Sequence, residues 1–134
     1  MARRRQARRR AVDILYQADV VRRHPLDVLE ERKALAEKVP GFTEDLVRGT
    51  AEHLDELDDL IGEHAEGWTV HRMAAVDRTL LRLACYEILY RNDVSPAVAI
   101  SEAVASAKEL STEDSGRFVN GILGSIVRER AGTA

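Results

Sequence analysis

Aromatic residues make up only 4% of this 134-residue chain, so its core must be built from Leu, Val, Ile and Ala. The single cysteine, Cys85, excludes an internal disulfide and favours the reducing cytoplasm. No segment approaches the run of about eighteen apolar residues that a membrane span requires. With 45% hydrophobic and 32% charged residues, the composition is typical of one globular domain, which we expect to cover residues 1–134.

Metal ligands and catalytic motifs are also missing. The sequence has no glycine-rich phosphate loop after a strand, no GxSxG and no HExxH. Cys85, within LLRLACYEIL, is typical of a small apolar core residue rather than a nucleophile. The four histidines have neither the spacing of a zinc site nor the Cys or acidic neighbours that it requires; they are His24, His53, His64 and His71. We therefore expect no enzyme activity, no metal and no cofactor.

The charge is unevenly distributed. Six of the 20 basic residues lie in residues 1–10, which contain no acid. The remaining 14 basic residues face 23 acidic ones, which gives the rest of the chain a net charge of −9. An acidic domain with an Arg-rich N-terminal arm at residues 1–10 indicates two different kinds of partner. A transit peptide is not expected, because the helical pattern continues past Asp13 and Asp19 without a break.

Hydrophobic periodicity predicts an all-α fold of six or seven helices. The first helix has an apolar stripe and ends before Pro25; the stripe is Ala7, Ala11, Ile14, Leu15, Ala18 and Val21. A second helix starts near Pro25, uses Leu35 and Val39, and ends at Pro40-Gly41. A third is predicted from an N-cap at Thr43 through Leu46 to Ile61, followed by a short helical turn around Trp68.

The segment from Met73 to Arg91 is apolar on more than one side, with Leu80 and Leu83 on one face and Leu81 and Cys85 on another. A helix of this kind is central and buried. It predicts two small helical bundles packed around it. Two further helices follow, one opened by Ser95-Pro96 and the last by a capping box of Ser111 and Asp114.

The arginine block carries the clearest functional signal. At 100° per residue, Arg5, Arg9, Val12 and Tyr16 share one outward stripe of the first helix. Guanidinium groups and an aromatic face together are typical of single-stranded RNA binding. A solvated terminus with Tyr16 in the core is the structural alternative. A protein target or an anionic membrane is a further alternative, the membrane being disfavoured because bulky apolar residues are missing between the arginines.

The last helix contains Gly121 and Gly124, each costing about 1 kcal/mol relative to alanine. Either close helix packing or the approach of a partner would explain them. Asp114, Arg117, Gly121 and Arg128 form an outward polar stripe on this helix. Phe118 borders the stripe, and a core position for Phe118 is equally consistent with the pattern.

Four segments in order carry a resemblance to a known family: RRRAVDILYQ, VDRTLLRLACYEI, SPAVAISEAVASAKEL and STEDSGRFVNGIL. They resemble the signature of the NusB family of bacterial transcription antitermination factors. The resemblance implies an all-α fold of two bundles and a role without catalysis. It also implies partners: a small-subunit ribosomal protein (NusE), the single-stranded boxA element of ribosomal RNA transcripts, other Nus factors and RNA polymerase.

Matched position by position, the resemblance also assigns site residues. RNA binding is implied for the start of the chain and for the last helix, namely for Arg4, Arg5, Arg8, Arg9, Tyr16, Asp114 and Phe118. Asp77 is implied for the ribosomal-protein contact, whereas Glu87 is assigned a structural role. An acidic surface suits a ribosomal protein, because such proteins are typically basic.

The sequence departs from the family pattern at Gln6, Ser101 and Gly124, which affects the expected RNA contacts but not the fold. Two alternatives stay open. The same fold precedes the catalytic domain of some ribosomal RNA cytosine methyltransferases, in which case a nucleotide-cofactor domain would follow Ala134. A helical protein-interaction module without an RNA role is the other.

Overall fold

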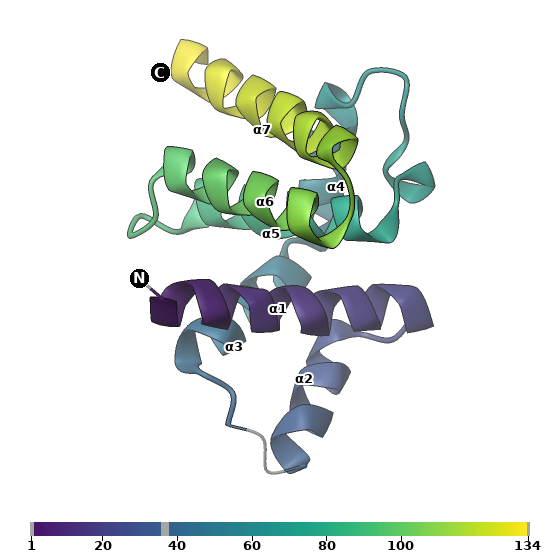
Figure 1. Ribbon diagram of the computed structural model, residues 1–134, viewed down its shortest axis with the longest axis vertical. Helices are drawn as coiled ribbons and strands as arrows, with labels where there is room; N and C mark the ends of the chain where they lie inside the picture. Colours follow the sequence, from purple (N-terminus) through teal and green to yellow (C-terminus); the bar gives the residue numbers. More distant parts are fainter. Residues whose placement is uncertain (1, 36–37, 134) are drawn as a thin grey trace.

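The computed structural model describes residues 2–35 and 38–133. Within these ranges the chain forms seven α-helices and one 3-10 helix without any strand, which confirms the all-α prediction. The helices fall into two bundles, which lie one above the other in Figure 1. The first bundle contains α1 (Ala2–Val21), α2 (Pro25–Ala34) and α3 (Gly41–Glu52). The second contains α4 (Leu54–His64), α5 (Ala75–Tyr90), α6 (Pro96–Leu110) and α7 (Glu113–Thr133), with the 3-10 helix η1 (Val70–Arg72) before α5.

Helix α5 is the centre of the molecule, as predicted. It packs against α1 and α3 of the first bundle and against α4, α6 and α7 of its own. Leu80 and Leu83 on one side and Leu81 and Cys85 on the other are all at most 2% exposed. Burial, followed by the charge of Asp58, raises the pKa of the Cys85 thiol to about 12. The thiol is therefore a protonated core group, as expected of an apolar filler.

The predicted stripe of α1 is confirmed from Ala7 to Ala18 but not at its end. Val21 is exposed, because α1 terminates there and the chain turns at Arg22, whose φ of 58° lies in the left-handed region. Val12 was expected to face outward but is only 6% exposed. The packing of α1 between its own bundle and α5 explains this, since it buries a wider face than a single stripe.

The predicted third helix is two helices, α3 and α4, separated at His53. The His53 ring stacks on Tyr90 of α5 with ring centroids 4.0 Å apart. The predicted N-cap at Thr43 is also wrong, because α3 begins at Gly41 and Thr43 is fully buried. The Thr43 hydroxyl instead donates to the backbone carbonyl of Ala7 at 2.7 Å, which joins α3 to α1.

The other helix boundaries agree with the prediction at the start of α6 but differ at the end of α2 and the start of α7. Ser95 caps α6 as expected, its Oγ accepting from the Val98 N–H at 3.2 Å. Helix α2 ends at Ala34 instead of continuing to Pro40, and Leu35 is exposed at its end. The predicted continuation crosses residues 36–37, which lie outside the described ranges. At the start of α7, Thr112 rather than Ser111 accepts the capping hydrogen bond, from the Ser115 N–H at 3.0 Å. None of the described helices is both long and apolar enough to cross a bilayer.

Candidate RNA and protein interface

The Arg-rich start of the chain forms the first turns of α1 and pairs with acidic residues of the second bundle. Arg4 Nη2 lies 2.6 Å from Asp93 Oδ2, in the loop before α6. Arg5 Nη2 lies 3.1 Å from Glu102 Oε2, and Arg9 Nη1 lies 3.0 Å from Glu109 Oε2, both on α6. The basic segment thus bridges the two bundles instead of extending freely into solvent.

Arg8 differs from the other three predicted RNA-binding arginines because it is buried. Its side chain is 10% exposed and lies against Glu87 of α5, which is 1% exposed. Nε and Nη2 of Arg8 donate to the Glu87 carboxylate at 2.7–3.1 Å, and Nη1 reaches Glu102 at 3.4 Å. This buried, bidentate ion pair joins the two bundles. Arg8 therefore shares the structural role that the sequence predicts for Glu87.

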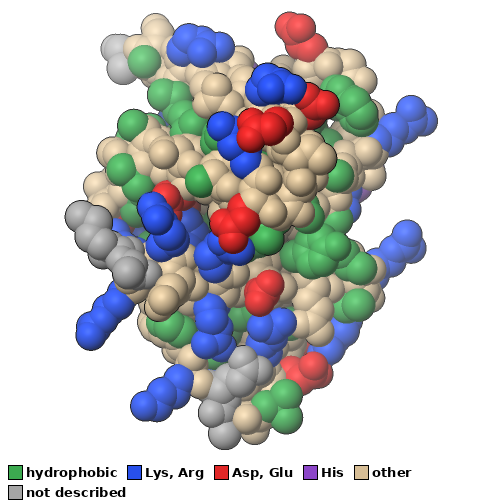
Figure 2. Space-filling model, viewed as in Figure 1, with side chains coloured by type: hydrophobic (Ala, Val, Ile, Leu, Met, Phe, Trp, Pro, Cys, Tyr) green, Lys and Arg blue, Asp and Glu red, His purple; other side chains and the backbone are tan. Residues whose placement is uncertain are grey.

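The other three arginines border open surface. The side chains of Arg4, Arg5 and Arg9 are 44%, 71% and 35% exposed. A groove of about 600 Å³ lies between α1 and the start of α6, lined by Arg4, Arg5 and the exposed Val98 among others. In Figure 2, basic side chains gather over α1 in the middle of this face, with acidic side chains between them.

Tyr16 lies further along α1, with 39% of the residue exposed. The alternative that placed Tyr16 in the core is therefore wrong. With Val12 buried, the outward stripe consists of Arg5, Arg9 and Tyr16. Charged and aromatic groups are thus both available on the solvent side of one helix.

Phe118 and Asp114 of α7 line a second pocket, of about 310 Å³, near η1 and the start of α5. Trp68, 53% exposed, stands against Phe118 in an edge-to-face arrangement with ring centroids 5.8 Å apart. Asp77, predicted for the protein partner, lines the same pocket. The structure thus brings together residues that were predicted for RNA and for protein binding.

Asp77 is an unusual carboxylate for the rim of a pocket. The residue is 7% exposed, and its Oδ1 has no hydrogen-bond partner among the described residues. Burial raises the pKa of the Asp77 carboxyl, and a hydrogen bond from Ser115 opposes that rise. An incoming N–H donor would satisfy the free oxygen, which makes Asp77 suited to a cationic or amide partner.

Gly121 and Gly124 of α7 do not serve internal packing. A Cβ at Gly121 would meet no atom within 4 Å, and one at Gly124 would meet only the flexible end of Arg128 at 3.2 Å. Close packing between helices is therefore not the reason for these glycines. Arg117 beside them pairs with Asp114 on the exposed side of α7.

Sequence reasoning missed several residues of this interface. Phe42 supports the arginines from α3, with the guanidinium carbons of Arg4 and Arg8 at 4.4 and 5.5 Å from its ring centroid. Nothing in the local sequence indicates this long-range contact. Trp68 could have been found, since it is the only tryptophan and lies in a polar connection. In the described part of the chain, no cluster of His, Cys, Asp and Glu could hold a metal ion.

Comparison with known proteins gives consistent matches along the chain. The NusB family matches residues 5–128. Transcription antitermination protein NusB of Salinispora arenicola is 52% identical, covering 94% of this chain and 96% of that protein. Its counterpart from a Nocardioides species is 45% identical over the full length of both.

Solved structures agree with the sequence matches. T. maritima NusB superposes with a TM-score of 0.84 at 39% identity, covering 94% of this chain and 91% of that one. A structure of antitermination factors NusB and NusE in complex with dsRNA has a chain that matches with a TM-score of 0.84 at 27% identity, over 96% and 98% of the two chains. Two bundles around α5, the four ordered motifs and the match over residues 5–128 agree, and the chain belongs to the NusB family.

Proposed function

We propose that this protein is a transcription antitermination factor that binds the boxA RNA of ribosomal RNA transcripts together with the ribosomal protein NusE. It would act without catalysis, as one domain over residues 1–134 in the cytoplasm, and with other Nus factors would keep RNA polymerase processive. The names of its relatives and the solved complex of NusB and NusE with dsRNA support this proposal.

The observation that carries the proposal is the set of exposed arginines on α1. Arg4, Arg5 and Arg9 are each held by an acid of the second bundle in a solvent-exposed ion pair. Such pairs contribute about 0–1 kcal/mol to stability. RNA phosphates can therefore replace the acids at little cost, and the pairs hold the guanidinium groups in place before RNA arrives.

Arg8 takes an indirect part in this scheme. Its guanidinium is engaged by Glu87 inside the molecule, so we assign it the role of fixing α1 against α5. Tyr16 lies farther along the same helix and would supply a stacking surface for a base.

The partner surface is proposed at the pocket of Asp77, Trp68 and Phe118. Its two carboxylates, Asp77 and Asp114, and its two aromatic rings favour a basic side chain of the ribosomal protein. Phe118 and Asp114 would then lie where RNA and protein meet, which agrees with their predicted place at or beside the RNA surface.

A binding assay with boxA RNA and NusE, separately and together, tests the proposal. The variant with Arg4, Arg5 and Arg9 changed to Gln should lose RNA affinity at least tenfold while still binding NusE. Asp77→Arg should weaken NusE binding and leave the binding of RNA by the protein alone largely unchanged.

A variant with Lys33, Arg48 and Arg72 changed to Gln is the matched control, since it removes three positive charges that line neither the α1 groove nor the pocket of Asp77. Equal RNA affinity of both triple variants would contradict the assignment of α1. Equal loss of RNA and NusE binding in Asp77→Arg would contradict the separation of the two contacts.

A further inference from the structure

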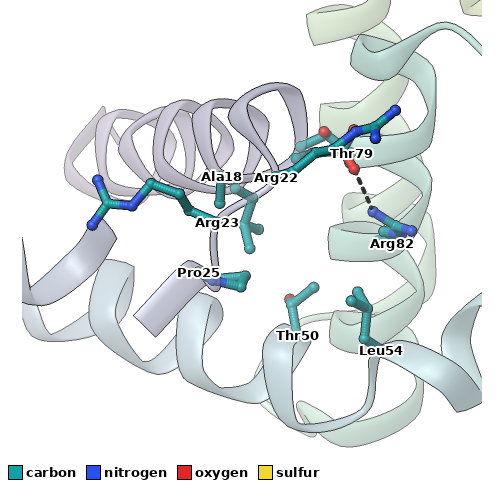
Figure 3. A pocket seen from close by; sticks show the side chains of 10 residues that line it. Ala18, Arg22, Arg23, Pro25, Thr50, Leu54, Thr79 and Arg82 are labelled. Carbon is teal, nitrogen blue, oxygen red and sulfur yellow. Dashed lines mark hydrogen bonds and ion pairs between the residues drawn. The ribbon is translucent and has the colours of Figure 1, made fainter. Parts of the chain in front are cut away.

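A separate cavity of about 200 Å³ lies where the end of α1 and the start of α2 approach α3, α4 and α5. Figure 3 shows it between the two bundles, with Thr50 and Leu54 on one side, Ala18 and Pro25 on another, and Arg82 of α5 closing it. None of the residues that were predicted from the sequence to bind RNA or NusE lines this cavity.

Two buried hydroxyl groups in its wall lack partners. Thr50 is 0% and Thr79 is 2% exposed, and the Oγ1 of each has no hydrogen bond among the described residues. A hydroxyl buried without a partner costs about 1–3 kcal/mol. Both line the same cavity from different helices, α3 and α5. A ligand that accepts hydrogen bonds would remove both penalties at once.

The charged groups of the wall favour an anion. Three arginines, Arg22, Arg23 and Arg82, line the cavity with a single acid, Asp19. Arg82 is occupied by Asp58 and Asp19, and Arg23 is paired with Glu31. Arg22 makes no side-chain ion pair with any described residue, and it is exposed at the cavity.

Two features of the backbone point the same way. Arg22 has a φ of 58°, a conformation that costs a residue with a side chain about 1 kcal/mol and that glycine would adopt freely. Leu54, the first residue of α4, also lines the cavity, and among the described residues no side chain caps that helix. The first N–H groups of α4 therefore add donors at this edge.

We propose that this cavity binds a small phosphate monoester. Arg22 and the two threonine hydroxyls would hold the phosphate, because guanidinium and hydroxyl donors suit its oxygens. The cavity has the volume of about seven liquid water molecules, which leaves room for a short organic segment. Leu15, Ala18 and Pro25 would contact that segment. The phosphate can come from a free sugar phosphate or from the 5′ end of a nucleic acid.

Nuclear magnetic resonance titration of the full chain with ribose 5-phosphate tests the proposal, with ribose and inorganic phosphate as companion probes. Ribose 5-phosphate should give saturable shifts of the amide resonances of Arg22, Thr50 and Thr79, and ribose none. A short RNA with a 5′-phosphate, compared with the same RNA carrying a 5′-hydroxyl, distinguishes the two sources. Tighter binding of ribose 5-phosphate than of ribose supports a site for a free sugar phosphate. Tighter binding of the RNA with the 5′-phosphate than of the RNA with the 5′-hydroxyl supports a site for the end of a nucleic acid.

Two variants separate binding from folding. The double variant T50V/T79V keeps the shapes but removes both hydroxyls, so phosphate affinity should fall at least tenfold while the thermal midpoint of the free protein is unchanged or higher. Arg22→Gly should behave in the same way, because it relieves the left-handed conformation while removing the guanidinium. A merely structural role for these residues would lower the midpoint.

Arg72→Ala is the control, since Arg72 is an exposed arginine that does not line the cavity. The proposal is wrong if no phosphate probe gives saturable shifts at these residues, or if T50V/T79V binds ribose 5-phosphate as tightly as the unaltered protein. Binding of boxA RNA and NusE should be the same in all of these variants, so failure here is distinguishable from failure of the proposed function.

Discussion

Removing one partner of the buried ion pair of Arg8 and Glu87 should destabilise the fold strongly, although the same arginine lies in the segment proposed for RNA binding. Glu87→Gln removes the carboxylate charge and leaves the Arg8 guanidinium 10% exposed, with only Glu102 at 3.4 Å as a charged partner. Breaking one side of a buried pair costs about 3–5 kcal/mol. Because Glu102 compensates in part, we expect the lower end, about 3 kcal/mol, which lowers the unfolding midpoint by about 10 °C.

Urea denaturation followed by circular dichroism at pH 7 measures this loss. Glu109→Gln is the matched control, because it removes the acid of the exposed Arg9 pair and should cost less than about 1 kcal/mol. The double variant with Arg8 and Glu87 both changed to Met should recover most of the loss, since no charge is then left unpaired. A loss below 1 kcal/mol in Glu87→Gln, or a double variant as unstable as the single one, would refute the reasoning.

Three further predictions concern single residues. Gly49→Ala should destabilise the fold by about 2 kcal/mol in chemical denaturation, because its Cβ would lie 2.0 Å from the Tyr86 ring and overpack the contact between α3 and α5; an unchanged midpoint would show that the ring moves freely. Asp77→Asn should stabilise the fold increasingly as the pH rises above the ordinary pKa of Asp and through the raised pKa of Asp77. The reason is that charging the buried carboxyl of the unaltered protein destabilises its folded state. A stability difference between the two proteins that stays constant in urea titrations from pH 3 to 7 would contradict this. Gly121→Ala should raise stability by about 0.5–1 kcal/mol, since its Cβ meets open space in a helix, and a concurrent loss of RNA or NusE affinity would identify Gly121 as a contact surface.

The sequence was sufficient for the helical architecture because the core of this protein is built on regular helical periodicity. The stripe from Ala7 to Ala18 and the two apolar faces of α5 are both found as predicted. The errors lie where tertiary contacts override local signals. Thr43 has the chemistry of an N-cap, but its hydroxyl is used by the Ala7 carbonyl of another helix. The break at His53 accompanies stacking on Tyr90, a residue 37 positions away in the chain.

The residue types of the candidate site could be predicted from the sequence, but their ion pairs and their burial could not. Residue type and helical phase indicated an arginine face with an aromatic side chain, and the structure has Arg5, Arg9 and Tyr16 there. The acids that pair with the arginines lie 79 to 100 residues away, and no local pattern reveals them. The sequence therefore does not distinguish the buried Arg8, which pairs with Glu87, from the exposed arginines beside it in the same block.

The salt dependence of boxA RNA binding tests the central claim most directly. If Arg4, Arg5 and Arg9 contact phosphates of a single strand, the affinity should fall with a log–log slope of about −2 against salt concentration. The variant with these three residues changed to Gln should bring the slope close to zero, whereas the Lys33, Arg48 and Arg72 control should retain it. A slope near zero for the unaltered protein, or an unchanged slope in the α1 variant, would contradict the assignment of this helix to RNA.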